Sequence, residues 1–216
     1  NYKYNIYIGG FSMELTELSI KKAVIRSQHC QRNWNLEKEI PQEDLQTMVH
    51  AITNCPSKQN AAFYNVYTIT DRDTIERIHE KTEGFYHRDE EKMVSNSQTL
   101  ANVLFVFTNN TEKSNRLNKK RDSYGDNEAS VGRDLHMATG IAAGYLNLTS
   151  SLMGYNTGCC ACFDPAQVAE ILDIDTHVHL LMGIGFKDET RPRREHHAED
   201  FVFPTKKKQN IQVDKC

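Results

Sequence analysis

The longest regular pattern in this 216-residue chain is LHMATGIAAGYLNLTSSLMG, residues 135–154. Its apolar residues recur every three or four positions, at Leu135, Ala138, Ala142, Tyr145, Leu148 and Leu152. This spacing predicts one long helix, and such a helix needs an apolar partner along its length. Small residues at Gly140, Ala143 and Gly144 would let another backbone approach it closely.

Shorter patterns on both sides predict further helices and strands. A first helix is expected over 13–27, and others begin at Pro41, at Asp71 and at Asp164-Pro165, the last running through Leu172. Aspartate suits the N-cap of a helix and proline its first turn. Strands are expected at 63–70, 103–107 and 178–186, where the chain is rich in β-branched and apolar residues.

Two polar stretches interrupt these elements. Residues 80–97 are irregular, and residues 108–133 form the longest polar segment, which we expect to be a surface excursion over a site. The chain has no internal repeat and no clean linker. We therefore expect a single α+β domain, or a mixed α/β sandwich, over residues 1–216, with residues 1–12 partly an extension or tag.

Composition excludes several classes of protein. A net charge of −3 gives no overall reason to expect a nucleic-acid or membrane partner. No apolar run approaches a membrane span, and the N-terminus lacks a signal-peptide pattern. Six cysteines, three of them clustered, do not resemble a secreted disulfide framework, so a cytoplasmic location is expected. Positive charge is concentrated locally in RPRRE (191–195) and KKK (206–208), which leaves an anion site open.

The cysteine cluster lies in GYNTGCCACFDPAQ, residues 154–167. A structural zinc site usually needs two separated ligand pairs, and no second cysteine pair follows. His177 and His179 are the nearest additional ligands, so a zinc-binding module stays as a distant alternative. The spacing also differs from an active CxxC redox motif. We favour the interpretation that these cysteines are small, partly apolar filling residues.

Two other short motifs combine polar groups. In QHCQRNW (28–34), His29 and Arg32 either present donors to an anion or form a solvated helix end. In CPSKQN (55–60), Ser57 and Asn60 either contact the polar edge of a heterocycle or form a plain turn. Together with the basic clusters, Arg32 would complete a phosphate-binding cradle. The chain contains neither GxGxxG nor a P-loop, and no nucleophile elbow or metalloprotease helix.

The order of these motifs resembles the FMN-dependent nitroreductase family over roughly residues 20–210. The matching segments are RSQHCQRNW, NCPSKQNAAFYNVYTITD, the long helix, LMGYNTGCCACFDPAQVAEIL, and LLMGIGF followed by basic residues. The resemblance implies a mixed sheet flanked by helices. It also implies a homodimer in which the extended C-terminal tail wraps the partner and FMN lies at the subunit interface.

The resemblance also implies which residues contact FMN. The family's first basic motif falls on residues 28–34, where Gln28 and Cys30 replace the usual Arg and Ser. The Pro-Ser-x-x-Asn motif matches Pro56, Ser57 and Asn60 without a gap. The full implied set is Gln28, His29, Cys30, Arg32, Pro56, Ser57, Asn60, Asn96, Gln98, Cys159, Cys160, Ala161, Cys162, Arg193, Lys206 and Lys208.

In this family the segment after the long helix runs beneath the flavin ring, and a backbone N–H there donates to flavin N5. The resemblance places that donor near Ala161 and Cys162, where the family often has Glu-Gly. Small side chains would then be needed because the backbone itself approaches the ring. The thiols would have a packing role, and no side chain need act as acid or base.

The implied activity is transfer of hydride from NAD(P)H through FMN to a small electron-poor acceptor, such as a nitroaromatic or a quinone, with ping-pong kinetics. Enone reduction, dehydrogenation and dehalogenation are other reactions of this fold. A flavin-binding protein without turnover is the alternative from a different class. Neither nucleic acid nor a membrane is an expected partner.

Overall fold

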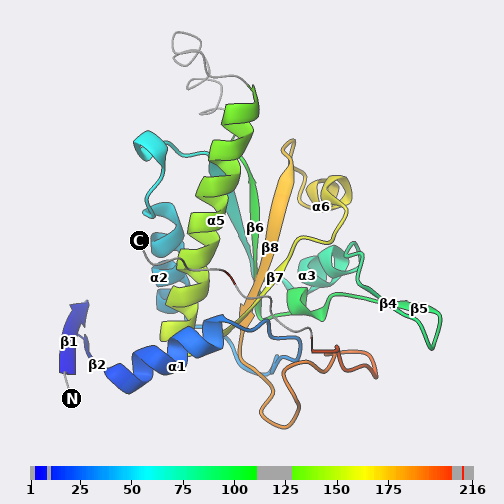
Figure 1. Ribbon diagram of the computed structural model, residues 1–216, viewed down its shortest axis with the longest axis horizontal. Coiled ribbons are helices and arrows are strands. Elements are labelled where there is room, and N and C mark those ends of the chain that lie inside the picture. The colour runs from blue at the N-terminus through cyan, green and yellow to red at the C-terminus, as the bar shows by residue number, and fades with distance from the viewer. Residues whose placement is uncertain (1–2, 9–10, 111–127, 206–210, 212–216) are drawn as a thin grey trace.

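The centre of the structure is a four-stranded sheet with strand order β3-β6-β8-β7. The structure is a computed structural model that describes residues 3–8, 11–110, 128–205 and 211 (Figure 1). Its strands are β3 (Tyr64–Ile69), β6 (Val103–Asn109), β7 (Asn156–Cys160) and β8 (Val178–Gly185). The strands expected at 63–70, 103–107 and 178–186 are thus confirmed.

Every pair of neighbouring strands in this sheet is antiparallel, so the expected mixed sheet is wrong for the described part of the chain. The long helix does join two strands of the same direction, β6 and β7. However, β8 lies between them and is antiparallel to both. The α+β class holds, but the parallel strands are not neighbours.

Helices cover both faces of the sheet (Figure 1). On one face lie α2 (Gln42–Thr53) and α5 (Glu128–Leu152), and on the other lie α3 (Arg72–His79) and α6 (Pro165–Ile171). Because strand side chains alternate, Phe105 and Phe107 of β6 pack toward α2 and α5, whereas Leu104 and Val106 pack toward α3 and α6. Both faces are therefore buried, which explains why the sequence of β6 is continuously apolar.

Helix boundaries follow local chemistry where a cap is present. The Asp71 carboxylate accepts a hydrogen bond from the Thr74 N–H at 2.8 Å, and Asp164 accepts from the N–H groups of Ala166 and Gln167. Helix α5 begins at Glu128 rather than at the expected residue 135, and the residues before it lie outside the described part of the chain. The first helix, α1 (Glu17–Ser27), also begins later than expected, because 11–16 form a strand.

Two short strand pairs lie outside the central sheet in the described chain. β1 (Lys3–Ile8) pairs with β2 (Phe11–Thr16), and β4 (Phe85–His87) pairs with β5 (Lys92–Val94). The second hairpin lies in residues 80–97, where strands of three residues are too short to show a period. The expected excursion over 108–133 begins in β6 and ends in α5, and its centre, 111–127, lies outside the described residues.

Two glycines bring a short 3-10 helix, η2 (Ser97–Thr99), directly onto the sheet. A Cβ at Gly183 of β8 would lie 2.1 Å from the Gln98 carbonyl oxygen, and one at Gly158 of β7 would lie 2.6 Å from the Gln98 Cβ. Only glycine allows this approach, which places the Gln98 side chain beside the cysteine segment. Among the described helices, none is long and apolar enough to span a membrane.

Candidate functional site

Four segments distant in sequence meet at the end of the sheet where β7 begins. The Gln31 N–H donates to the Thr157 carbonyl at 2.8 Å, and the Arg32 N–H donates to the Arg193 carbonyl at 2.9 Å. The Gln98 side-chain amide donates to the Cys159 carbonyl at 2.6 Å. The first motif, η2, β7 and the basic RPRRE segment therefore lie side by side, and their joint role in binding a ligand stays a prediction.

A cluster of arginines forms the charged part of this site. The Arg32 guanidinium stacks 4.5 Å above the centre of the Phe203 ring, and its Nε is buried without a hydrogen-bond partner among the described residues. Burial lowers the pKa of Arg32, and the nearby charges of Arg193 and Arg194 lower it further. In the described part of the chain no carboxylate forms an ion pair with Arg32. A dianion such as a phosphate monoester would supply the missing negative charge and acceptors.

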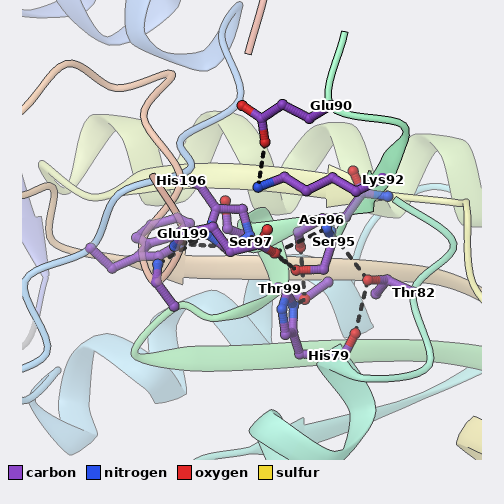
Figure 2. A network of polar contacts seen from close by, with 12 residues as sticks. His79, Thr82, Glu90, Lys92, Ser95, Asn96, Ser97, Thr99, His196 and Glu199 are labelled. Atoms are coloured by element: carbon purple, nitrogen blue, oxygen red, sulfur yellow. Dashed lines mark hydrogen bonds and ion pairs between the residues drawn. The ribbon is translucent and has the colours of Figure 1, made fainter. Parts of the chain in front are cut away.

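The neutral part of the site consists of amides and hydroxyls held by η2. The Trp34 indole N–H donates to the Ser97 carbonyl at 2.9 Å and fixes η2 against the first motif. Figure 2 shows Asn96, Ser97 and Thr99 within a continuous polar network. Several buried side-chain atoms here have no partner among the described residues, namely Gln98 Oε1, Ser97 Oγ, and Oδ1 and Nδ2 of Asn33. They can serve a planar ligand that carries both donors and acceptors.

The cysteine segment divides between core and surface. Cys160 is 2% exposed and packs in the core with α3 and α6, whereas Cys159 faces the opposite side of β7 and Ala161 and Cys162 are exposed. The side chain of Cys160 points into the core, because successive residues of a strand alternate, and a contact of its backbone with a ligand stays a prediction. Burial raises the pKa of Cys159 to about 12 and that of Cys160 to about 11.

Those pKa values leave both thiols protonated near neutral pH, which agrees with a packing role rather than a redox role. The described residues contain no group of three or more His, Cys, Asp or Glu side chains arranged to hold a metal ion. The described cysteines are free thiols.

The Pro56–Asn60 turn does not join this site within one chain. It lies at the opposite end of α5, where Lys58 forms an ion pair of 2.9 Å with the buried Asp134. The first motif lies near the other end, where Arg26 donates to the Ser151 carbonyl. From 134 to 151 the helix rises about 26 Å at 1.5 Å per residue. Figure 1 shows the same separation along α5.

The turn itself is tightly constrained. Ser57 Oγ donates to the Ala61 carbonyl at 2.7 Å, and Gln59 and Asn60 adopt left-handed φ values of 55° and 53°. Asn60 is exposed, and it lines a groove of about 710 Å³ between α2 and β3 together with Ser57. The short polar residues at this end of the molecule therefore line a groove that a ligand or a second chain can enter.

The remaining predicted residues fall in three groups. Gln28 and His29 are exposed at the end of α1, and Cys30 is half-buried, its carbonyl accepting from Arg193 Nη1 at 3.4 Å. Asn96 is 8% exposed, and its carbonyl accepts from Thr99 Oγ1. Lys206 and Lys208 lie outside the described residues.

Asn33, Arg194 and Phe203 were not among the residues that we expected from the sequence to contact a ligand. Arg194 had a signal, since it follows Arg193 in the same basic cluster, and its Nη1 donates to the Phe203 carbonyl at 3.3 Å. The other two had none, because their roles come only from tertiary contacts.

Comparison with known proteins identifies the fold. A model of the nitroreductase family matches residues 25–186. A search of curated proteins finds no match. Among solved structures, a nitroreductase family protein from Streptococcus pneumoniae aligns with a TM-score of 0.62 and 18% identity, covering 88% of this chain and 96% of that chain.

Two further structures are similar. A protein from Exiguobacterium sibiricum, solved in complex with FMN, has a TM-score of 0.63 and 13% identity and covers 82% of this chain and 91% of its own. An FMN-dependent nitroreductase from Clostridium difficile has a TM-score of 0.57 and 14% identity, covering 79% and 90%. At these identities the structural likeness establishes the shared fold.

The missing hydrogen-bond partner of Arg32 Nε leads to a prediction for the ligand-free protein. Replacing it, as Arg32→Gln, removes a half-buried cation that has no counter-charge among the described residues, so the free energy of unfolding should stay the same or rise by up to about 1 kcal/mol. The matched control is Arg72→Gln. Burial also lowers the pKa of Arg72, but its guanidinium donates to the carbonyls of Leu100 and Ala101.

Losing Arg72 should therefore destabilise the protein by about 1–3 kcal/mol, because two buried carbonyls lose their donor. Chemical denaturation of both flavin-free variants measures the difference. Equal destabilisation by the two changes would mean that Arg32 has a structural role and is not kept for a ligand.

Proposed function

The chain belongs to the nitroreductase family, and on that premise we propose that it is an FMN-dependent oxidoreductase that takes hydride from NAD(P)H and passes it to an electron-poor organic acceptor. The family resemblance seen in the sequence motifs is thus confirmed. The single observation that carries the cofactor assignment is Arg32, a half-buried cation whose buried Nε has no hydrogen-bond partner among the described residues, beside two more arginines. When bound, FMN would supply the hydride chemistry, which no protein side chain can perform.

The arginine cluster would hold the phosphate of FMN. Guanidinium groups match phosphate oxygens geometrically and stay charged even when their pKa falls somewhat. Arg32 contributes from the first motif, while Arg193 and Arg194 contribute from the segment after β8. Because the Arg32 N–H already donates to the Arg193 carbonyl, the two backbones are fixed relative to each other before any ligand binds.

The neutral groups would orient the flavin ring. Asn33 and Gln98 both present unpartnered amide atoms, so they suit the donor and acceptor pattern of a pyrimidine edge. Ala161 and Cys162 are exposed residues, and a backbone N–H of this segment would donate to the flavin. No described carboxylate or histidine is needed for proton transfer in this proposal.

A homodimer would bring the Pro56–Asn60 turn to this site from a second copy. The outer side of α5 carries exposed apolar side chains, and a Cβ at Gly140 or Gly144 would meet nothing within 4 Å. These residues are Met137, Ile141, Tyr145 and Leu148, with exposures between 40% and 52%. An apolar stripe of this kind along a helix marks an interface. Since the turn and the arginine cluster lie at opposite ends of α5, antiparallel pairing of two α5 helices would bring each turn to the partner's arginines.

The C-terminal tail would add to this interface. β3 is an edge strand of the sheet, and the groove beside it is bounded by α2. An edge strand offers unpaired backbone groups that another chain can pair with. We propose that the tail of the partner, which follows Phe203, covers this edge.

The test of the activity is the absorption spectrum of the FMN-loaded protein under anaerobic conditions, before and after NADPH or NADH. The flavin band should bleach with at least one nicotinamide and return when a quinone or nitroaromatic is added. A bound flavin that neither nicotinamide reduces would favour the alternative of a flavin-binding protein without turnover. A protein that binds no FMN at all would contradict the proposal.

The dimer makes a second prediction. Ile141→Glu places a charge at the centre of the apolar stripe on both copies, so the dimer dissociation constant should rise at least about a hundredfold, equivalent to about 3 kcal/mol. FMN affinity should fall with it, because each site then loses the partner's turn. Analytical ultracentrifugation and FMN titration measure both effects.

The matched control is Met93→Glu on β5, which replaces an equally exposed apolar residue away from the stripe. It should leave both assembly and FMN affinity within about threefold of the wild type. A dimer that tolerates Ile141→Glu as well as Met93→Glu would place the interface elsewhere.

A further inference from the structure

The two arginines Arg193 and Arg194 begin a hairpin, residues 193–203, that closes on itself. The Phe203 N–H donates to the Arg194 carbonyl at 2.9 Å, and the His196 N–H donates to the Phe201 carbonyl at 2.7 Å. A single bridge between Glu195 and Val202 completes the pairing. The position of the arginines therefore depends on the turn that closes this hairpin.

One side chain, His196, organises that turn. It is 1% exposed, and its Nδ1 accepts hydrogen bonds from the backbone N–H of Ala198 at 3.0 Å and of Glu199 at 2.9 Å. An atom that accepts two N–H groups cannot carry a proton, so the neutral ring must have its proton on Nε2. His196 thus caps the turn in the way that an asparagine side chain caps an Asx turn.

The other ring nitrogen connects the turn to the segment before η2. Nε2 lies 3.0 Å from Ser95 Oγ, and Ser95 Oγ donates to Glu199 Oε1 at 3.0 Å, as Figure 2 shows. These three residue types are those of a hydrolytic triad. Here, however, Nε2 is the donor and Ser95 the acceptor, so His196 cannot remove a proton from Ser95. The arrangement holds the hairpin in place and is not nucleophilic.

We propose that His196 is a positioning residue for the phosphate of FMN: its neutral ring holds the 193–203 hairpin in the shape that presents Arg193 and Arg194 beside Arg32, and its protonation releases them. This inference rests on the proposed function, because it concerns the same phosphate site. A proton on Nδ1 would face two N–H donors, so the turn at Ala198 and Glu199 must open when the ring is charged.

The contacts of His196 extend to the first arginine. Its ring is stacked with the Phe203 ring at an interplanar angle of 19° and a centroid distance of 6.1 Å. The Arg32 guanidinium lies over the same Phe203 ring. Opening of the hairpin would therefore disturb the packing of Arg32 as well as the position of the other two arginines.

Burial of His196 favours a neutral ring, whereas the Glu199 carboxylate, whose Oε1 lies 3.4 Å from Nε2, favours a protonated one. Burial lowers its pKa below the ordinary value of 6.5, Glu199 opposes this change, and His197 contributes to it. From α3, the ring of His79 approaches to 6.1 Å, and burial followed by the charge of His196 lowers the pKa of His79 to about 4.

The direction of the pH effect is set by the lowered pKa. A histidine whose pKa is lower in the folded state is neutral above about 6.5, and there it stabilises the turn fully. Its contribution is lost as the pH falls below that value, so acid should loosen the hairpin.

The experiment compares the wild type with His196→Asn, His196→Leu and the control His197→Leu, using FMN and riboflavin as separate probes. Asparagine can accept the same two N–H groups but does not titrate, whereas leucine cannot accept them. At pH 7.5, His196→Leu should weaken FMN binding about tenfold, and His196→Asn and His197→Leu should remain within about threefold of the wild type. Riboflavin lacks the phosphate, so its affinity should stay within about threefold in every variant.

The pH arm repeats the FMN titrations at pH 5. Part of any loss there comes from FMN itself, whose phosphate has a second pKa near 6. His196→Asn measures that part, and the wild type should lose at least about threefold more. Hydrogen exchange of the ligand-free protein should show that the amides of Ala198 and Glu199 lose protection at pH 5 in the wild type but not in His196→Asn, after correction for the intrinsic exchange rates.

Three outcomes would overturn this inference. FMN binding by His196→Leu equal to the wild type would show that the hairpin does not need its cap. Equal losses for FMN and riboflavin would show a general structural role. The same pH dependence in His196→Asn and the wild type would remove the titrating role. If the wild type itself bound no FMN, the proposed function would fail first, and the exchange data would still report whether His196 caps the turn.

Discussion

The rest of the site depends on the positive charge of Arg32, which the described residues of the protein do not fully compensate. The residue is partly buried, its Nε has no partner among the described residues, and the charges of Arg193 and Arg194 act against its own charge. A folded protein normally pairs such a charge, because desolvation without a counter-ion is costly. The backbone contacts to Arg193 and Thr157, and the Phe203 ring beneath the guanidinium, all fix this unfavourable arrangement in place. It becomes favourable when an anion is present, which is why the cluster indicates a phosphate site.

The length of α5 decides how a complete site can be built. Its rise of about 26 Å between residues 134 and 151 keeps the arginine cluster and the Pro56–Asn60 turn at opposite ends, too far apart for one FMN molecule to contact both in the same chain. The exposed apolar stripe between them gives a physical reason for two copies to pair along this helix. Binding of the cofactor and assembly of the dimer would then be coupled, since each subunit supplies only part of a site.

Sequence patterns predicted the elements that have a strong local signal. The long helix, the three apolar strands and the aspartate caps at Asp71 and Asp164 were all expected. The β4–β5 hairpin and the antiparallel order were not, because three-residue strands show no period and strand order depends on long-range pairing. In the site, a local motif indicated Arg32 and the family resemblance indicated Gln98, but neither indicated the roles of Asn33 and Phe203, which arise from tertiary contacts. The turning of the Cys160 side chain into the core was also not expected, because the segment was not recognised as a strand with alternating side chains.

The claim that one site needs two subunits can be tested by complementation. Arg32→Gln removes the phosphate contact, and Ser57→Ala combined with Asn60→Gly removes the turn's polar groups while glycine keeps the left-handed backbone. Each homodimer should bind FMN weakly. A heterodimer purified with two different tags should bind one FMN per dimer with wild-type affinity, because both defects fall in one site and the other site is intact. A heterodimer that binds FMN no better than either homodimer would contradict the account, since each site would then take both sets of residues from the same chain.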